Sequence, residues 1–118
     1  MKRGTTMNYT VQDLKTIIAK ATQEAQAAAA EAFVENGNSD ADMCGFAWVE
    51  FYGIKGNTKL GKALKAAGVD QSWDRTFQIW GGKFYNGQSI TIKERACRAA
   101  VEVFKRYGFN ACVGSRLD

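Results

Sequence analysis

Histidine and proline are absent from this 118-residue sequence, and it has only three cysteines. Without histidine, neither a Ser-His nor a Cys-His nucleophile pair can form, and no side chain titrates near neutral pH unless its pKa is shifted. A metal site is disfavoured as well, because the sequence also lacks a CxxC pair. The wide spacing of Cys44, Cys97 and Cys112 argues against a disulfide framework and predicts a reducing, cytosolic setting in which the thiols are small buried hydrophobic side chains. We expect no cofactor and no metal.

Long apolar runs are also missing. No stretch approaches the roughly 18–20 consecutive apolar residues that a membrane helix requires, and no signal-peptide pattern follows Met1. Internal repeats and low-complexity linkers are absent. The sequence therefore predicts one intracellular domain over residues 1–118, with a flexible tail at 1–8 and no membrane partner. A chain of this length builds an ordinary hydrophobic core without disulfide or metal staples.

The stretch Cys44–Tyr52 has the strongest strand chemistry, because it is rich in aromatic and branched residues and lies between polar and glycine-containing segments. Phe46 and Trp48 fall on one face and Ala47 and Val49 on the other, so both faces are apolar. A strand of this kind is usually central in its sheet and covered on each side. We therefore expect the remaining elements to pack around it.

A long helix is predicted from Thr10, which forms a helix-start signature with Asp13, to about Glu35. Its apolar residues alternate at spacings of four and three and are mostly alanine, so that a partner can approach closely. This stripe consists of Leu14, Ile18, Ala21, Ala25, Ala28 and Ala32. It fits a helix lying on its own sheet, which we favour, or a helix that pairs across a homodimer.

A second, short helix is expected after the strand, with Asn57 or Thr58 as its cap and Gly68 as its end. Three lysines follow at intervals of three along one face of this helix: Lys59, Lys62 and Lys65. The free amides of a helix start beside lysines suit an anion. The glycine spacing is not that of a Walker loop. The pattern is typical either of an anion site or of a lysine face that is merely solvated.

Residues 75–80 alternate as a strand does, with apolar side chains on one face and Trp80 on the other. The following Gly81-Gly82 predicts a two-residue hairpin turn, because such turns require positive φ angles. Trp80, Lys83 and Tyr85 place aromatic rings beside cations. This combination suits stacking on bases, although aromatic residues in small sheets also belong to ordinary cores.

The last part of the chain predicts a third helix and a final strand. Thr91 and Glu94 repeat the helix-start pattern, Gly108 ends the helix, and Phe109–Val113 forms a short strand beside the central one. The elements together predict an α+β fold: a small, mainly antiparallel sheet of about four strands, packed on one face by the long N-terminal helix and two further helices.

Charge is shared unevenly along the chain. Residues 1–53 carry four basic and seven acidic side chains, net −3, whereas residues 54–118 carry twelve basic and five acidic ones, net +7, which together give the formal net charge of +4. This asymmetry favours an anionic partner for the basic part. A basic surface that is merely solvated explains it equally well.

An ordered set of motifs runs through the second part of the chain: Cys44–Val49 (CGFAWV), Gly56–Lys62 (GNTKLGK), Trp80, Gln88-Ser89, Lys93-Glu94, Gly108-Phe109 with Ala111, and Gly114–Asp118 (GSRLD). Taken together, they resemble a family of small proteins of unknown function that tailed bacteriophages encode. The sequence departs from that family at Gly81-Gly82, where Asn-Pro often occurs, and at Arg95–Cys97, where Ala-Gly-Ala is usual. The resemblance implies an accessory protein in the cytoplasm of an infected bacterial host cell, and it brings no established activity or catalytic residue.

Three functional hypotheses follow. The first is a non-enzymatic protein that binds an anionic ligand, nucleic acid or a nucleotide, through lysines that supply charge, aromatic rings that stack and an arginine that grips phosphate. Its candidate residues are Asn57, Lys59, Lys62, Lys65, Trp80, Lys83, Tyr85 and Arg116. The second is an inhibitor or modulator of a host enzyme or defence complex, with exposed aromatic residues as anchors. The third is a small enzyme with a carboxylate site built from Asp40, Asp42 and Glu50.

Overall fold

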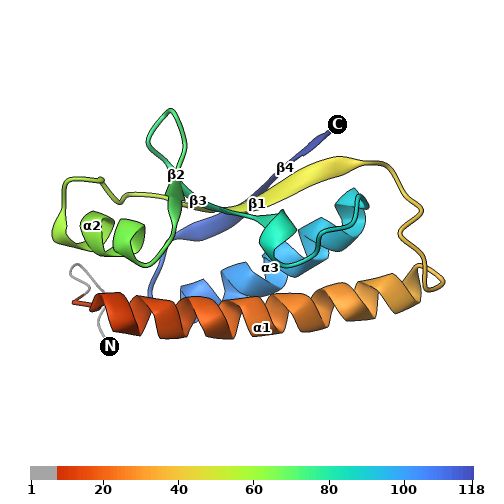
Figure 1. Cartoon of the computed structure of the whole chain (residues 1–118), viewed down its shortest axis with the longest axis horizontal. Coiled ribbons are helices and arrows are strands. Elements are labelled where there is room, and N and C mark those ends of the chain that lie inside the picture. Colours follow the sequence, from red (N-terminus) through yellow and green to blue (C-terminus); the bar gives the residue numbers. More distant parts are fainter. Residues whose placement is uncertain (1–7) are drawn as a thin grey trace.

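The computed structural model describes residues 8–118, so the tail predicted at 1–8 lies, apart from Asn8, outside the described residues. Three α-helices, one short 3₁₀ helix and four strands follow one another along this part of the chain (Figure 1). In order they are α1 (Val11–Glu35), β1 (Gly45–Phe51), α2 (Lys59–Ala66), β2 (Asp70–Gln71), β3 (Phe77–Trp80), η1 (Gly81–Lys83), α3 (Ile90–Arg106) and β4 (Ala111–Leu117). The predicted α+β class, with its long N-terminal helix, is confirmed. Neither α1 nor any other helix within residues 8–118 has both the length and the apolar composition needed to cross a membrane.

The sheet has the strand order β2-β3-β1-β4, and every neighbouring pair is antiparallel. β1 is central, as its sequence predicts, because Trp48 lies opposite Trp80 on β3 and opposite Gly114 on β4. β4 is also adjacent to β1 as predicted, but it runs to Leu117 instead of ending at Val113. The terminal motif of the sequence is therefore part of the sheet.

The N-terminus of α1 is the predicted capping box. The Thr10 hydroxyl accepts a hydrogen bond from the Asp13 amide at 3.0 Å, and the Asp13 carboxylate accepts one from the Thr10 amide at 2.9 Å. Two amides that the helix itself leaves free are satisfied in this way. The start of α1 is thus encoded entirely by local sequence.

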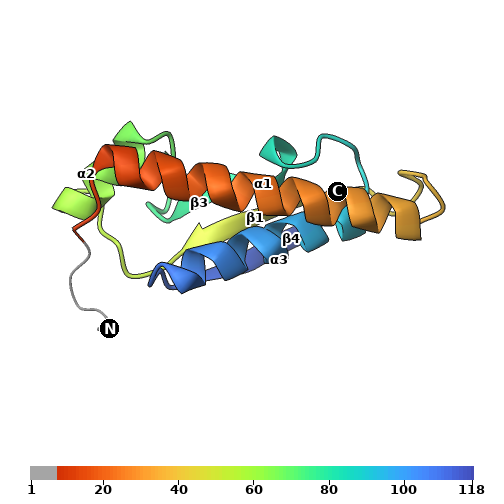
Figure 2. The ribbon, with the colours of Figure 1, turned by 90° about the horizontal axis from the view of Figure 1, so that it is seen from below.

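α1 and α3 lie side by side beneath the sheet, and α3 also contacts β1 and β4 directly (Figure 2). The buried side of α1 is the alanine-rich stripe, with Ile17 and Ala29 buried in place of the predicted Ile18 and Ala28. Small side chains on both helices let their backbones approach closely. The stripe is therefore covered by the third helix of the same chain.

No helix of residues 8–118 covers the opposite face of the sheet (Figure 1). Burial alternates along β1, so that Ala47, Val49 and Phe51 are buried against the helices whereas Phe46 and Trp48 on the other face stay partly exposed. The prediction that β1 is covered on both sides is wrong for this second face. The aromatic side chains there cover one another and are not covered by a further element.

The prediction of a hairpin turn directly after β3 is wrong. Gly81 and Gly82 lie in the 3₁₀ helix η1, and neither has a positive φ angle. Gly81 serves a different purpose, because a Cβ there would lie 2.7 Å from the Ala47 carbonyl oxygen and 3.0 Å from the Cys97 sulfur. Its missing side chain lets η1 pack closely on β1 and α3.

α3 begins at Ile90 with Ser89 as its N-cap, earlier than the predicted start at Thr91. The Ser89 hydroxyl accepts a hydrogen bond from the Ile92 amide and donates one to the Asp42 carboxylate at 2.7 Å. Asp42 also accepts a bond from the Thr91 amide at 3.0 Å. Because Asp42 belongs to the loop after α1, the local sequence gives no sign of this second partner.

The three cysteines differ in their surroundings. Cys97 is buried as predicted, and burial raises its pKa to about 12. Cys112 is partly buried, while Cys44 is exposed and its thiol donates to the Gln88 side-chain oxygen at 3.0 Å. The prediction of a buried thiol is therefore wrong for Cys44.

Candidate functional site

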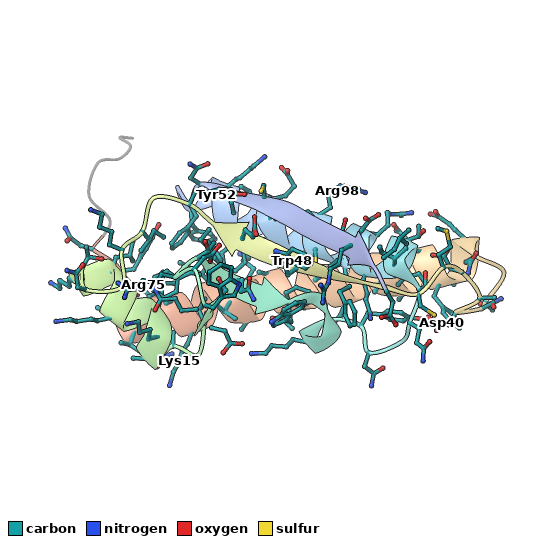
Figure 3. All side chains as sticks on the ribbon, turned by 90° about the horizontal axis from the view of Figure 1, so that it is seen from above. Lys15, Asp40, Trp48, Tyr52, Arg75 and Arg98 are labelled. Carbon is teal, nitrogen blue, oxygen red and sulfur yellow. The ribbon has the colours of Figure 1, made fainter. Side chains whose placement is uncertain are left out.

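The face of the sheet opposite the helices carries three aromatic rings, and one of them contacts the other two. The Trp80 ring lies 6.3 Å from that of Phe46 and 5.2 Å from that of Trp48, measured between centroids. The antiparallel register brings them together, because Trp48 and Trp80 are directly opposite and Phe46 is the next residue along β1 on the same face. We call Phe46, Trp48 and Trp80 the aromatic platform. Figure 3 shows this face, with Trp48 near its middle.

Two cations lie beside Phe46 on this face. The guanidinium of Arg116, which is opposite Phe46 on β4, and the ammonium of Lys93 from α3 are each 5.4 Å from the centroid of the Phe46 ring. Lys93 is held there because it donates a hydrogen bond to the Gly45 carbonyl at 3.0 Å. Arg116 is exposed and forms no salt bridge within residues 8–118. Its guanidinium donors therefore have no carboxylate partner in this part of the chain.

Trp48 is fixed in the platform from two sides. Its indole nitrogen donates a hydrogen bond to Glu50 at 2.9 Å, and Glu50 also accepts one from the Tyr52 hydroxyl at 2.6 Å. Hydrogen bonds with Cys112 and with Glu50 raise the pKa of Tyr52. On the neighbouring strand, Gly114 leaves room for the indole, because a Cβ there would lie 2.5 Å from its Cε2 atom. The position of this ring is therefore set by contacts within the chain.

A pocket of about 780 Å³ lies between the loop after β1, α2 and the β2–β3 hairpin. Its lining residues are Ile54, Lys55, Gly56, Asn57, Lys62, Lys65, Gln71 and Arg75. Four of these residues are cations and none is acidic. We call this the basic pocket. Figure 3 shows Arg75 towards the same end of the molecule as α2.

Local sequence around Thr58 builds the wall of the basic pocket. The Thr58 hydroxyl caps α2 by accepting a hydrogen bond from the Gly61 amide at 3.0 Å, and it donates one to the Lys55 carbonyl at 2.6 Å. A Cβ at Gly61 would clash with that carbonyl, so the loop lies directly on the helix. Gly68, with φ of 100°, follows the helix as predicted. These contacts hold Lys55 beside the lysines of α2.

The structure divides the predicted ligand residues between several places. Trp80 and Arg116 come together on the platform face. Three others line the basic pocket: Asn57, Lys62 and Lys65. Lys59 is on the same helix but is not among the residues that line the pocket.

Lys83 and Tyr85 belong neither to the platform nor to the lining of the basic pocket, and each has a partner of its own. Lys83 forms a salt bridge of 3.8 Å with Asp70, and both side chains are more than half exposed. Tyr85 donates a hydrogen bond to the Asp40 carboxylate, and burial together with this bond raises the pKa of Tyr85 to about 12. Tyr85 therefore helps to hold the loop after α1, which contains Asp40, in place.

Several residues of the candidate site were not predicted from the sequence: Phe46, Trp48, Lys55, Arg75 and Lys93. Glu50 could have indicated Phe46 and Trp48. All three residues alternate onto the same face of β1, and a charged residue on that face indicates that the face is partly exposed. Lys55 and Arg75 come from loops, and their approach to α2 depends on the tertiary fold. Lys93 reaches Phe46 only because α3 starts beside β1.

The carboxylates proposed for an enzyme site have structural roles. Asp40 accepts hydrogen bonds from the Tyr85 hydroxyl, from the Gln88 amide at 2.8 Å and from the Ser89 amide at 3.1 Å. The bond from Tyr85 contributes most to lowering the pKa of Asp40, and the bond from Ser89 does the same for Asp42. Both residues therefore bind the loop after α1 to the start of α3.

Glu50 does not join Asp40 and Asp42. It lies near the other end of β1, and the five steps from Gly45 to Glu50 span about 17 Å at the usual strand rise. Within residues 8–118, no group of three or more His, Cys, Asp or Glu side chains is placed to hold a metal ion. The three carboxylates thus form no common site.

The docking of this loop predicts an acid-sensitive fold. Because Asp40 and Asp42 have pKa values below the unfolded value of about 3.9, their ionised forms stabilise the fold above that pH, and this contribution is lost as the pH falls through the folded-state values. We expect Asp42→Ala to lower the unfolding temperature near neutral pH and to reduce its dependence on pH below about 4. Thermal unfolding followed by circular dichroism, with Glu102→Gln as the control, measures both effects. Equal stability of Asp42→Ala and wild type at every pH would contradict the assignment.

Comparison of the chain with protein-family models, with curated proteins and with solved structures finds no match. The function is therefore inferred from the geometry and charge of the platform and the basic pocket.

Proposed function

We propose that this protein binds single-stranded nucleic acid on the open face of its sheet and does so without catalysis. The observation that carries the proposal is the aromatic platform, in which Trp80 contacts Phe46 and Trp48 on an uncovered face with two cations beside Phe46. Stacking of a base on an exposed aromatic ring contributes about 1–3 kcal/mol. Four-stranded sheets whose surface aromatics stack two or three bases are a common mode of single-stranded RNA recognition.

Positive charge lies beside one end of the platform and, at the other end of the sheet, in the basic pocket. Arg116 and Lys93 are beside Phe46, and the basic pocket is at the end where β2 pairs with β3. Trp80 and Phe77 are about 10 Å apart along β3 at the usual strand rise, and Phe77 pairs with Gln71 of the pocket. Gln71 faces the same side of the sheet as the buried Phe77, so a nucleic-acid strand that follows β3 reaches the pocket by turning over the β2–β3 end of the sheet, with cations near its phosphates at both places.

The setting we propose is the cytoplasm of an infected bacterial cell, in which this protein acts as a phage-encoded accessory protein. This part of the proposal depends on the resemblance of the ordered motifs to small phage proteins. A homodimer stays a prediction, and binding on the platform does not require one.

A second candidate function is inhibition or modulation of a host protein. The observation that favours it is Trp73, which lies on the turn between β2 and β3 and is 94% exposed. Figure 1 shows this turn projecting from the sheet on the side away from the helices. A protruding tryptophan is a typical anchor of a protein interface.

The test is titration of a fluorescently labelled single-stranded oligonucleotide of about 12 nucleotides, followed by anisotropy. We expect the logarithm of the association constant to fall linearly with the logarithm of the salt concentration between about 50 and 200 mM. Replacing Lys59, Lys62 and Lys65 by glutamine is expected to weaken binding and to flatten the slope by about 0.7 for each lysine that contacts a phosphate. Lys15→Gln with Lys20→Gln, on α1, is the control and should change neither.

Two outcomes would contradict the proposal. Unchanged affinity and slope in the triple lysine variant would remove these lysines from the interface. If no oligonucleotide binds, and a host protein instead co-purifies at fixed stoichiometry, survives moderate salt and is lost on Trp73→Ala, the second function replaces the first.

A further inference from the structure

The basic pocket gathers four cations from three separate segments: Lys55 from the loop after β1, Lys62 and Lys65 from α2, and Arg75 from the β2–β3 turn. None of the four forms a salt bridge within residues 8–118. No acidic side chain is among the lining residues. The pocket therefore holds positive charge that this part of the protein leaves uncompensated.

The acidic residues on the adjoining hairpin are engaged elsewhere. Asp70 forms its salt bridge with Lys83 at 3.8 Å. Asp74 accepts a hydrogen bond from the Ser72 hydroxyl and one from the Thr76 amide at 3.1 Å, and these bonds lower its pKa. Neither carboxylate lines the pocket, although both are close to Arg75 in sequence. The hairpin thus contributes Arg75 to the lining of the pocket, while its carboxylates Asp70 and Asp74 have other partners.

The side chains of the pocket converge on Gly56. A Cβ at this position would lie 2.9 Å from the side-chain nitrogen of Gln71 and 3.1 Å from the ammonium of Lys65. The side chains of Gln71 from the hairpin and Lys65 from α2 therefore both approach the backbone of Gly56. Arg75 has φ of 71°, a left-handed conformation that is strained for a non-glycine residue. The turn keeps Arg75 in this conformation, with its side chain lining the pocket.

We propose that the basic pocket binds a phosphate group with two or more negative charges, either the terminal phosphate of a nucleic-acid strand or the phosphates of a free nucleotide. Four cations around one cavity repel one another, and a bridging phosphodiester with a single charge offsets only part of that repulsion. A terminal phosphate or a polyphosphate offsets more of it. The side-chain amide of Asn57 supplies further donors, as does the second N–H of the Gln71 amide, whose nitrogen also donates to the Arg75 carbonyl at 2.9 Å. The terminal-phosphate source rests on the proposed function, whereas the nucleotide source does not.

The experiment compares ligands that differ only in their phosphates. Oligonucleotides of about 12 nucleotides with a 5′-phosphate, with a 3′-phosphate or with hydroxyl ends are titrated by anisotropy. Inorganic pyrophosphate and ATP are titrated by calorimetry. We expect one of the phosphorylated strands to bind about threefold to tenfold more tightly than the hydroxyl strand at low salt. Pyrophosphate is expected to bind on its own.

Variants assign these effects to the pocket. Lys62→Gln with Lys65→Gln is expected to abolish both the preference for a phosphorylated end and the binding of pyrophosphate. Arg75→Gly is expected to do the same while leaving the unfolding temperature unchanged or raised, because glycine adopts φ of 71° without strain. Lys20→Gln removes the same charge from a helix outside the pocket, and it should retain both effects.

The outcomes separate this proposal from the proposed function. Equal binding of all three strands, with no binding of pyrophosphate or ATP, would overturn the phosphate site and leave the aromatic platform standing. A preference for phosphate that survives both pocket variants would overturn it too. Binding of ATP and pyrophosphate that needs Lys62, Lys65 and Arg75, in a protein that binds no strand, would support the pocket as a nucleotide site and refute the proposed function.

Discussion

Trp80→Ala is expected to weaken the binding of a single-stranded oligonucleotide by about 5- to 150-fold, the range that corresponds to one lost base–aromatic stack. Trp80 is the most exposed ring of the platform, at 37%, and it contacts both of the others. Its removal therefore deletes one stacking surface and leaves Phe46 and Trp48 less well supported. The measurement is the dissociation constant from anisotropy at fixed salt.

Trp73 provides the matched control for this variant. It lies on the turn between β2 and β3 and is 94% exposed. It is therefore an exposed tryptophan that does not belong to the platform. Trp73→Ala should leave the dissociation constant unchanged, and Trp80→Phe, which keeps a smaller ring, should give an intermediate value. A larger loss of binding for Trp73→Ala than for Trp80→Ala would place the ligand elsewhere.

Gly114→Ala is expected to reduce binding by a similar factor, although residue 114 offers no side chain to a ligand. The added Cβ would lie 2.5 Å from the Cε2 atom of Trp48, so the indole has to move and its hydrogen bond to Glu50 is lost. Overpacking of this kind costs about 1–3 kcal/mol in stability. Anisotropy measures the loss of binding, and near-ultraviolet circular dichroism reports the displaced tryptophan.

Ser115→Ala is the control for Gly114→Ala, because residue 115 is the neighbouring position on β4 and its side chain alternates to the other face. It should change neither binding nor the tryptophan signal. Thermal unfolding of both variants shows whether the fold persists. Normal oligonucleotide binding by a folded Gly114→Ala variant with a displaced indole would show that the platform geometry does not matter.

The class of fold was predictable because its signals are local. The capping box of Thr10 and Asp13, the aromatic run of β1 and the glycine after α2 each specify an element within a few residues. The errors occurred where distant contacts decide the outcome. Ser89 caps α3 with help from Asp42, and Gly81 is required by its approach to Ala47 and Cys97, so neither position can be interpreted from its neighbours in sequence alone.

The candidate site was predictable only in part, for a similar reason. Residue type indicates Trp80 and Arg116, but the strand register is what brings both to Phe46. Lys62 and Lys65 were selected as a helix face, while Lys55 enters from a loop whose path depends on the packing of Gly61. The sequence thus indicated the kinds of side chain, and the tertiary fold determines which of them act together.

Tryptophan fluorescence provides the most direct test of the central claim that bases stack on the aromatic platform. The Trp73→Phe variant leaves Trp48 and Trp80 as its only tryptophans, and both are in the platform. Titration of this variant with an unlabelled single-stranded oligonucleotide is expected to quench its fluorescence saturably, with the dissociation constant found by anisotropy, and added salt should reverse the quenching. Strand binding detected by anisotropy without any change in the fluorescence of Trp48 and Trp80 would contradict the account.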